Sequence, residues 1–158
     1  NDYFLIDAAD ETSQSITLKT KLNHITAIHF MIGVDSIKNT SGIQSGSLDP
    51  LNGMFWTWNT GYIMAKLEGT SPQANTPAHR FTFDVGGYQQ NENAVRFVTL
   101  QLNSAAANNN IYIKADVLKW FYHQHVISIA ATPVCHQPGA LAMRIADNYS
   151  GMFSVIEK

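Results

Sequence analysis

The chain has little charge, a single cysteine and no long apolar run, and each shortage excludes a class of protein. Charged residues make up 14% of the 158 residues and the formal net charge is −2, whereas a nucleic-acid-binding surface is strongly basic. Cys135 has no second cysteine with which to form an internal disulfide. No apolar run in the sequence is long enough to cross a bilayer as a helix.

Sequence patterns of the common enzyme sites are also missing. The chain contains no Gly-x-Ser-x-Gly elbow, no Gly-rich phosphate loop between a strand and a helix, and no His-Glu-x-x-His pair. Asp84 and Asp116 are isolated acids, without a second carboxylate at a spacing that suits general acid and base catalysis. We therefore predict that the protein is not an enzyme.

Short alternating segments separated by Gly, Asn and Pro dominate what is present. We expect helix only after Asp116 and from Ala140 to Tyr149, and long loops at residues 35–52 and 70–80. The chain is therefore predicted to be mainly β, a single domain over residues 1–158 with the fold of an antiparallel β-sandwich that has one or two short helices and long loops. Alternation or apolar runs predict strands at residues 3–6, 15–19, 28–34, 62–67, 81–85, 94–102, 111–113, 126–129 and 152–155.

Two of the three tryptophans lie one residue apart in the stretch from Gly53 to Tyr62. Alternate residues of a strand share a face, so Trp56 and Trp58 would point the same way if both lie on the strand that follows the long loop. Two adjacent indoles suit either the core between two sheets or the wall of a binding site. The sequence leaves both interpretations open.

Histidine and cysteine supply the candidate metal ligands. An extended His123-Gln124-His125 segment places two imidazoles on one face, and Cys135-His136 follows within reach of the same edge. Imidazole and thiolate ligands suit copper and zinc. His29 lies between apolar neighbours, where it faces solvent, makes a hydrogen bond in the core or binds metal. The candidate metal ligands are His29, His123, His125 and His136, and a solvated pair at His123 and His125 is the alternative interpretation.

Several segments carry a family resemblance. The run from Asp49 to Tyr62 resembles the signature of the MbnP-like family, periplasmic proteins named after a partner in methanobactin copper handling. The supporting segments follow in the family's order, at Phe30–Ser36, Lys66–Gly69, Phe81–Tyr88 and Ile145–Phe153.

The resemblance implies an exported, non-catalytic copper-binding or copper-handling protein, located in the periplasm or at the cell surface and often attached through an N-terminal lipid signal that is removed. In relatives a tryptophan is oxidised to kynurenine by a partner enzyme and binds copper together with histidine, which makes Trp56 and Trp58 the candidates here. The alternative function is a binding module for a protein or glycan with no metal. Because family members carry strands upstream of Tyr3, we expect either a fragment or a sandwich that is closed differently.

Overall fold

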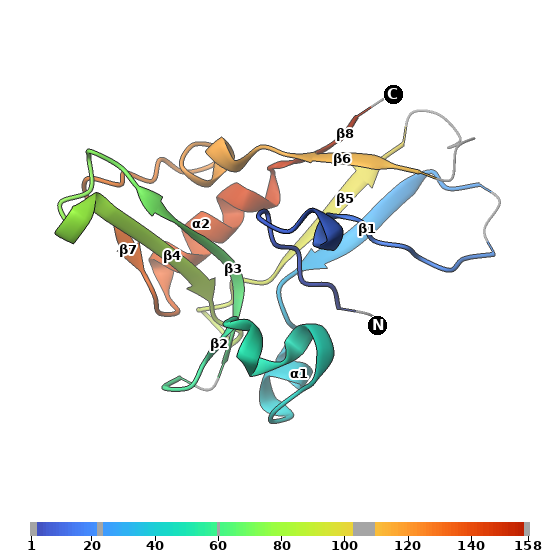
Figure 1. The fold of residues 1–158 in the computed structure, drawn as a ribbon, viewed down its shortest axis with the longest axis horizontal. Helices are drawn as coiled ribbons and strands as arrows, with labels where there is room; N and C mark the ends of the chain where they lie inside the picture. The colour runs from blue at the N-terminus through green and yellow to red at the C-terminus, as the bar shows by residue number, and fades with distance from the viewer. Residues whose placement is uncertain (1–2, 22–23, 60, 103–109, 157–158) are drawn as a thin grey trace.

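A computed structural model describes residues 3–21, 24–59, 61–102 and 110–156. Figure 1 shows that the described strands form three small sheets around helix α2. Two of the sheets are antiparallel pairs, and the third has four strands in the order β2-β3-β4-β7. The strands are β1 (Ala27–Ile32), β2 (Phe55–Trp56), β3 (Gly61–Thr70), β4 (Arg80–Gly86), β5 (Arg96–Gln101), β6 (Tyr112–Ala115), β7 (Val134–Cys135) and β8 (Phe153–Ile156). The pairs are β1 with β5 and β6 with β8.

Helical segments are short apart from one. The α-helices are α1 (Ser36–Thr40) and α2 (Ala140–Ser150). The 3-10 helices are η1 (Glu11–Gln14), η2 (Gly46–Leu48), η3 (Pro50–Asn52), η4 (Pro77–His79) and η5 (Val117–Trp120). The predicted helix from Ala140 to Tyr149 is confirmed as α2. The predicted helical turn after Asp116 is confirmed as η5, whose first turn is capped by the Asp116 carboxylate accepting a hydrogen bond from the N–H of Leu118.

Strand β4 follows the alternation that its sequence predicts. Phe81, Phe83 and Val85 are buried, whereas Thr82 and Asp84 are only half-buried because they point to the other face of the sheet. The buried face of β4 packs against α2. The α2 residues on that side follow helical spacing, and Ile145, Ala146 and Tyr149 are all 0% exposed. The core of the domain therefore lies between β4 and α2.

Helix α2 also packs against η5 and β5. The ring of Trp120, at the end of η5, lies 5.0 Å from that of Tyr149. The hydroxyl of Tyr149 donates a hydrogen bond to the carbonyl of Ala94, just before β5. Figure 1 shows the same arrangement, with α2 crossing behind β3 and β4 and running toward β5. The C-terminal end of α2 is thus held against two segments that are distant in sequence.

The predicted mixture of many strands and little helix is confirmed, and three details differ. The described strands form three separate small sheets and do not show a two-sheet sandwich. Pairing is antiparallel except between β4 and β7, which are parallel. Residues 3–6 and 15–19 form no strand, and residues 126–129 contribute only a bridge from Val126 to Tyr122. Alternation makes a strand only where a neighbouring strand accepts its hydrogen bonds.

The predicted long loop at residues 35–52 contains α1, η2 and η3. Aspartates cap two of these helices, α1 and η3, because a side-chain oxygen at the N-cap accepts a hydrogen bond from an N–H of the first turn. Asp35 accepts from Lys38 and Asp49 accepts from Leu51.

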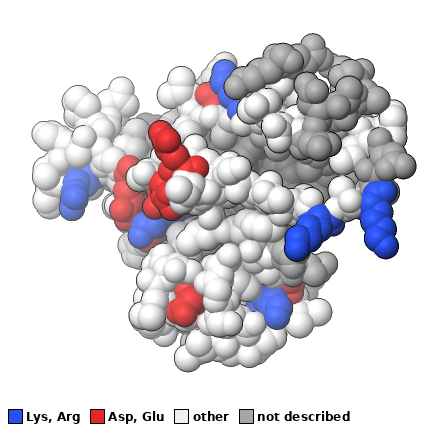
Figure 2. Space-filling view, turned by 45° about the vertical axis from the view of Figure 1, so that its right-hand side comes forward, with Lys and Arg blue, Asp and Glu red and all other residues white. Residues whose placement is uncertain are grey.

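Charged side chains are few and scattered over the face shown in Figure 2. No helix within the described ranges is long and apolar enough to span a membrane.

Candidate functional site

The His123-Gln124-His125 segment forms a tight turn directly after η5. Tyr122 and Val126 pair as an isolated antiparallel bridge. Inside that bridge the N–H of His123 lies 3.5 Å from the carbonyl oxygen of His125. The two histidines therefore lie in a closed turn and not in an extended strand.

Asn148 of α2 fixes this turn to the helix. Its side-chain oxygen accepts a hydrogen bond from the N–H of His125 at 2.8 Å. Its amide nitrogen donates to the carbonyls of His125 at 2.8 Å and of Trp120 at 3.0 Å. Asn148 is 0% exposed, so these bonds satisfy a polar side chain that has no access to water.

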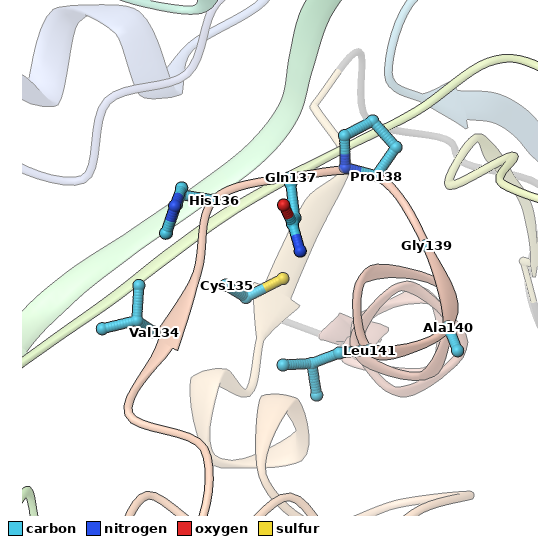
Figure 3. Close-up of a pocket in the computed structure, with 8 residues that line it drawn as sticks. All are labelled: Val134, Cys135, His136, Gln137, Pro138, Gly139, Ala140 and Leu141. Atoms are coloured by element: carbon cyan, nitrogen blue, oxygen red, sulfur yellow. The ribbon is translucent and has the colours of Figure 1, made fainter.

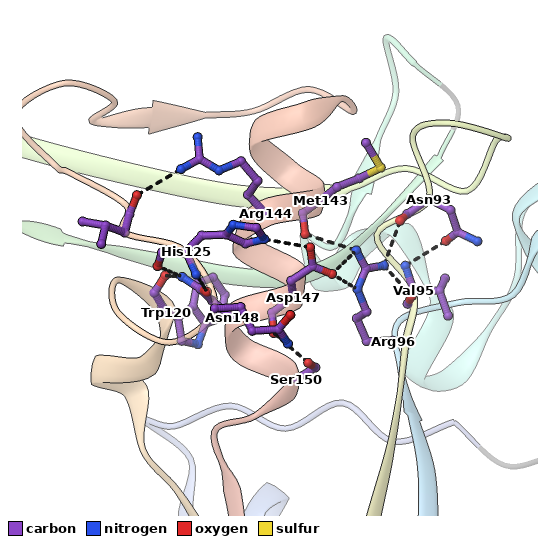
Figure 4. A network of polar contacts seen from close by, with 12 residues as sticks. Asn93, Val95, Arg96, Trp120, His125, Met143, Arg144, Asp147, Asn148 and Ser150 are labelled. Carbon is purple, nitrogen blue, oxygen red and sulfur yellow. Dashed lines mark hydrogen bonds and ion pairs between the residues drawn. The ribbon is translucent and has the colours of Figure 1, made fainter.

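The imidazole of His125 points toward the preceding helix residue, Asp147 (Figure 4). Its Nε2 lies 3.1 Å from Oδ2 of Asp147. The other carboxylate oxygen of Asp147 binds Arg96 of β5 through Nε and Nη2, both at 2.8 Å. Arg96 therefore fixes one oxygen of the carboxylate, and the contact of His125 with the other oxygen sets its orientation.

The imidazole of His123 lies over Gly151, four residues after Asp147. A methyl group at Gly151 would be 2.3 Å from Cε1 of His123, which means that the ring occupies this space. Gly151 is the C-cap residue that directly follows α2. Both imidazoles therefore lie near the C-terminal end of the helix.

The electrostatics of this helix end favour cations, because the last carbonyls of a helix carry a partial negative charge. Two side chains of the neighbouring segments already donate to these carbonyls. Gln124 donates to the Asp147 carbonyl at 3.2 Å, and the Lys119 ammonium donates to the Gly151 carbonyl at 2.8 Å. These donors, one of them charged, already compensate part of the negative charge at this helix end.

Cys135 and His136 lie elsewhere, on and just after β7. Cys135 is buried, and its sulfur points into a pocket of about 260 Å³ lined by residues 134–141 (Figure 3). Burial raises the pKa of the Cys135 thiol to about 11, so the sulfur is a neutral thiol at neutral pH. Metal binding there would first have to remove that proton.

His136 is exposed and lies near Asp84 of β4. Burial raises the pKa of the Asp84 carboxyl, and the neighbouring Lys66 ammonium, 3.6 Å from Oδ1, opposes this rise. That oxygen is inaccessible to solvent and makes no hydrogen bond within the described residues. The Asp84 carboxylate is therefore a largely buried charge that the Lys66 ammonium compensates only in part.

His29 lies on β1, exposed, with Nδ1 at 2.8 Å from the hydroxyl of Thr99 on the paired strand. This is the solvent-facing, hydrogen-bonded position that its alternating neighbours indicated. His29 contacts neither the His123-Gln124-His125 turn nor the tryptophans through any of the hydrogen bonds or ring contacts of the described residues.

The two tryptophans do lie side by side, with ring centroids 5.5 Å apart, but only one of them is on a strand. Trp56 ends β2 and is 5% exposed, whereas Trp58 lies in the turn between β2 and β3 and is 62% exposed. The prediction that both lie on one strand is therefore wrong for Trp58, since the chain already turns back at residue 57. Trp56 fills the core and Trp58 covers it from the solvent side.

The predicted site residues fall in four places. In the view of Figure 1 the turn between β2 and β3 lies below the four-stranded sheet, whereas η5 lies above it. Trp56 and Trp58 lie together in one of these places, and among the predicted metal ligands His123 and His125 lie in one turn against α2. Nowhere in the described ranges do three or more His, Cys, Asp or Glu side chains gather closely enough to hold a metal ion.

Three residues of this arrangement were not predicted from the sequence, namely Arg96, Asp147 and Asn148. Asp147 and Asn148 lie on α2, and their position next to the apolar Ile145 and Ala146 could have indicated a polar stripe beside the buried face. Nothing in the sequence indicated their partners, which lie 51 residues away for Arg96 and 22 for His125.

Comparison with known proteins gives one result. The sequence model of the MbnP family matches residues 1–137. No curated protein and no solved structure matches the chain. The match includes the His123-Gln124-His125 turn and both tryptophans of the β2–β3 turn, and it ends before α2.

Proposed function

Because this chain belongs to the MbnP family, we propose that it is an exported, non-catalytic protein that binds copper as its cargo in the periplasm or at the cell surface. The observation that supports this most is the pair of imidazoles held over the C-terminal end of α2. Imidazole nitrogen is a good ligand for copper, and it needs no charge of its own to bind the ion.

The donor set fits an open site and not a closed copper centre. Two imidazoles from one turn leave coordination positions free, because no third His, Cys, Asp or Glu joins them among the described residues. A site with free positions can take up a metal ion and release it to another ligand more readily than one whose positions are all filled by protein. This is the behaviour needed for copper handling, as opposed to copper storage in a core.

Copper titration of double variants tests this assignment. We expect about one copper ion per chain in the unaltered protein and loss of that uptake in His123→Ala/His125→Ala. The matched control is His29→Ala/His136→Ala, which removes the other two candidate ligands and should bind as the unaltered protein does. Binding should weaken toward acid pH, because protons compete with the metal for imidazole.

Competition against a chromogenic copper chelator, with elemental analysis of the purified protein, gives the affinity and the stoichiometry. Equal uptake by the two double variants would contradict the assignment of the turn. No uptake by the unaltered protein would contradict the function.

Trp58 is the better candidate for oxidation to kynurenine, since a partner enzyme reaches an exposed ring more easily than a buried one. Protein isolated from its native cells should show the small increase in intact mass that replaces one ring carbon by oxygen. The increase should disappear in Trp58→Phe and remain in Trp56→Phe, with circular dichroism as the check on folding. An unshifted mass in the unaltered protein and in both variants would contradict the oxidation of tryptophan to kynurenine.

The alternative, a module that binds a protein or glycan without metal, is favoured by one observation. Trp58 presents an exposed indole that packs against the buried indole of Trp56. Such a ring suits stacking against a sugar or an apolar side chain. An unshifted mass together with no copper uptake would leave this alternative as the function.

A further inference from the structure

The protonation of His125 follows from its contact with Asp147. An ionised carboxylate has no proton to donate, so the contact of 3.1 Å requires a proton on Nε2 of the imidazole. The hydrogen bond from Nε of Arg96 and the ion pair with its Nη2 stabilise the ionised form of Asp147. Neutral His125 is therefore held as the tautomer that carries its proton on Nε2.

The second ring nitrogen, Nδ1, then carries the free lone pair. Among the residues that the structure describes, none makes a hydrogen bond to this atom. The side chain of His125 is 34% exposed, so an ion can approach it from solvent. Histidines that bind metals commonly donate their other N–H to a carboxylate, which fixes the tautomer and makes the ligating nitrogen more basic.

Arg96 makes this arrangement rigid. Besides Asp147, its guanidinium donates to the carbonyls of Asn93 and Val95, both at 2.8 Å, and of Met143 at 3.1 Å (Figure 4). The carboxylate is therefore fixed by a side chain that is itself anchored to two segments of backbone. On its other side, the turn that carries His125 is fixed by Asn148.

We propose that His125 binds the cation through Nδ1 and that Asp147, oriented by Arg96, is the positioning residue that holds the imidazole in this tautomer. This inference rests on the proposed copper function and specifies the ligating atom of that site. His123, over Gly151, is the second imidazole near the C-terminal end of the helix.

Histidine nitrogen signals in long-range ¹H–¹⁵N spectra of the metal-free protein test the tautomer directly. We expect the proton of neutral His125 on Nε2, and a shift of the Nδ1 signal when Cu(I) is added. A proton on Nδ1, or a copper-dependent shift confined to Nε2, would overturn the inference. This measurement uses the unaltered protein and does not depend on whether any variant folds.

Copper affinity of Asp147→Asn supplies the second test. Loss of such a carboxylate typically lowers metal affinity about 10- to 100-fold, and we expect a decrease of that size. Glu11→Gln is the matched control, because it removes the same charge from an exposed position in η1 and should bind copper unchanged. Circular dichroism of both variants establishes that they are folded.

The two tests separate failure of the inference from failure of the proposed function. Copper uptake by the unaltered protein with equal affinity in Asp147→Asn and Glu11→Gln would overturn only the role of Asp147. Absence of copper uptake by the unaltered protein would overturn the proposed function and the inference with it.

Discussion

Replacing Asn148 by alanine is expected to lower the free energy of unfolding by about 3 kcal/mol, because it leaves buried backbone groups without partners. The N–H of His125 and the carbonyls of His125 and Trp120 all lose the side chain that satisfies them. Asn148 is 0% exposed, so water cannot replace it without opening the structure. Denaturant unfolding followed by circular dichroism measures the loss.

Two companion variants make this result specific. Asn148→Asp keeps the shape but replaces the donating amide by a group that, when ionised, faces two carbonyls; we expect it to be at least as destabilising as alanine. Asn75→Ala, at an exposed position, should change stability by less than about 0.5 kcal/mol. A small effect of Asn148→Ala would mean that the turn carrying His123 and His125 is held by other contacts.

Replacing Gly86 by alanine is expected to destabilise the protein by up to about 3 kcal/mol through overpacking. The added methyl group would lie 2.7 Å from Cζ3 of Trp56 and 2.7 Å from the carbonyl oxygen of Tyr62. The carbonyl belongs to β3, which pairs with β4, so it cannot move away cheaply. The indole of Trp56 has to move instead. The emission maximum of tryptophan fluorescence should therefore shift to longer wavelength, toward that of a solvent-exposed indole.

Gly61→Ala is the matched control for this prediction, because it lies on the neighbouring strand of the same sheet. A methyl group there would meet its nearest neighbour, the Tyr88 ring, at an ordinary contact distance of 3.5 Å. Near-native stability for Gly61→Ala and a clear loss for Gly86→Ala would establish Trp56 as part of the core. Equal stability of both variants would contradict the packing of Trp56 against β4.

Features whose causes lie within a few residues could be predicted from the sequence alone. The alternation of Phe81, Phe83 and Val85 predicted β4 because side chains of a strand alternate between two faces. The segment after the stop at Pro138-Gly139 predicted α2, and the capping Asp116 ahead of apolar residues at helical spacing predicted a helical turn. The family was likewise predicted from contiguous segments, and the match over residues 1–137 confirms it.

Contacts between residues distant in sequence could not be predicted in this way, because they depend on how the elements pack. The separation of the tryptophans from the histidine turn depends on how β2, β3 and η5 are arranged about the four-stranded sheet. The contacts of His125 with Asp147 and of Asp147 with Arg96 depend on the docking of α2 against η5 and β5. Periodicity and capping determine which element forms, whereas the side chains that meet are determined by the packing of elements, to which many distant residues contribute together.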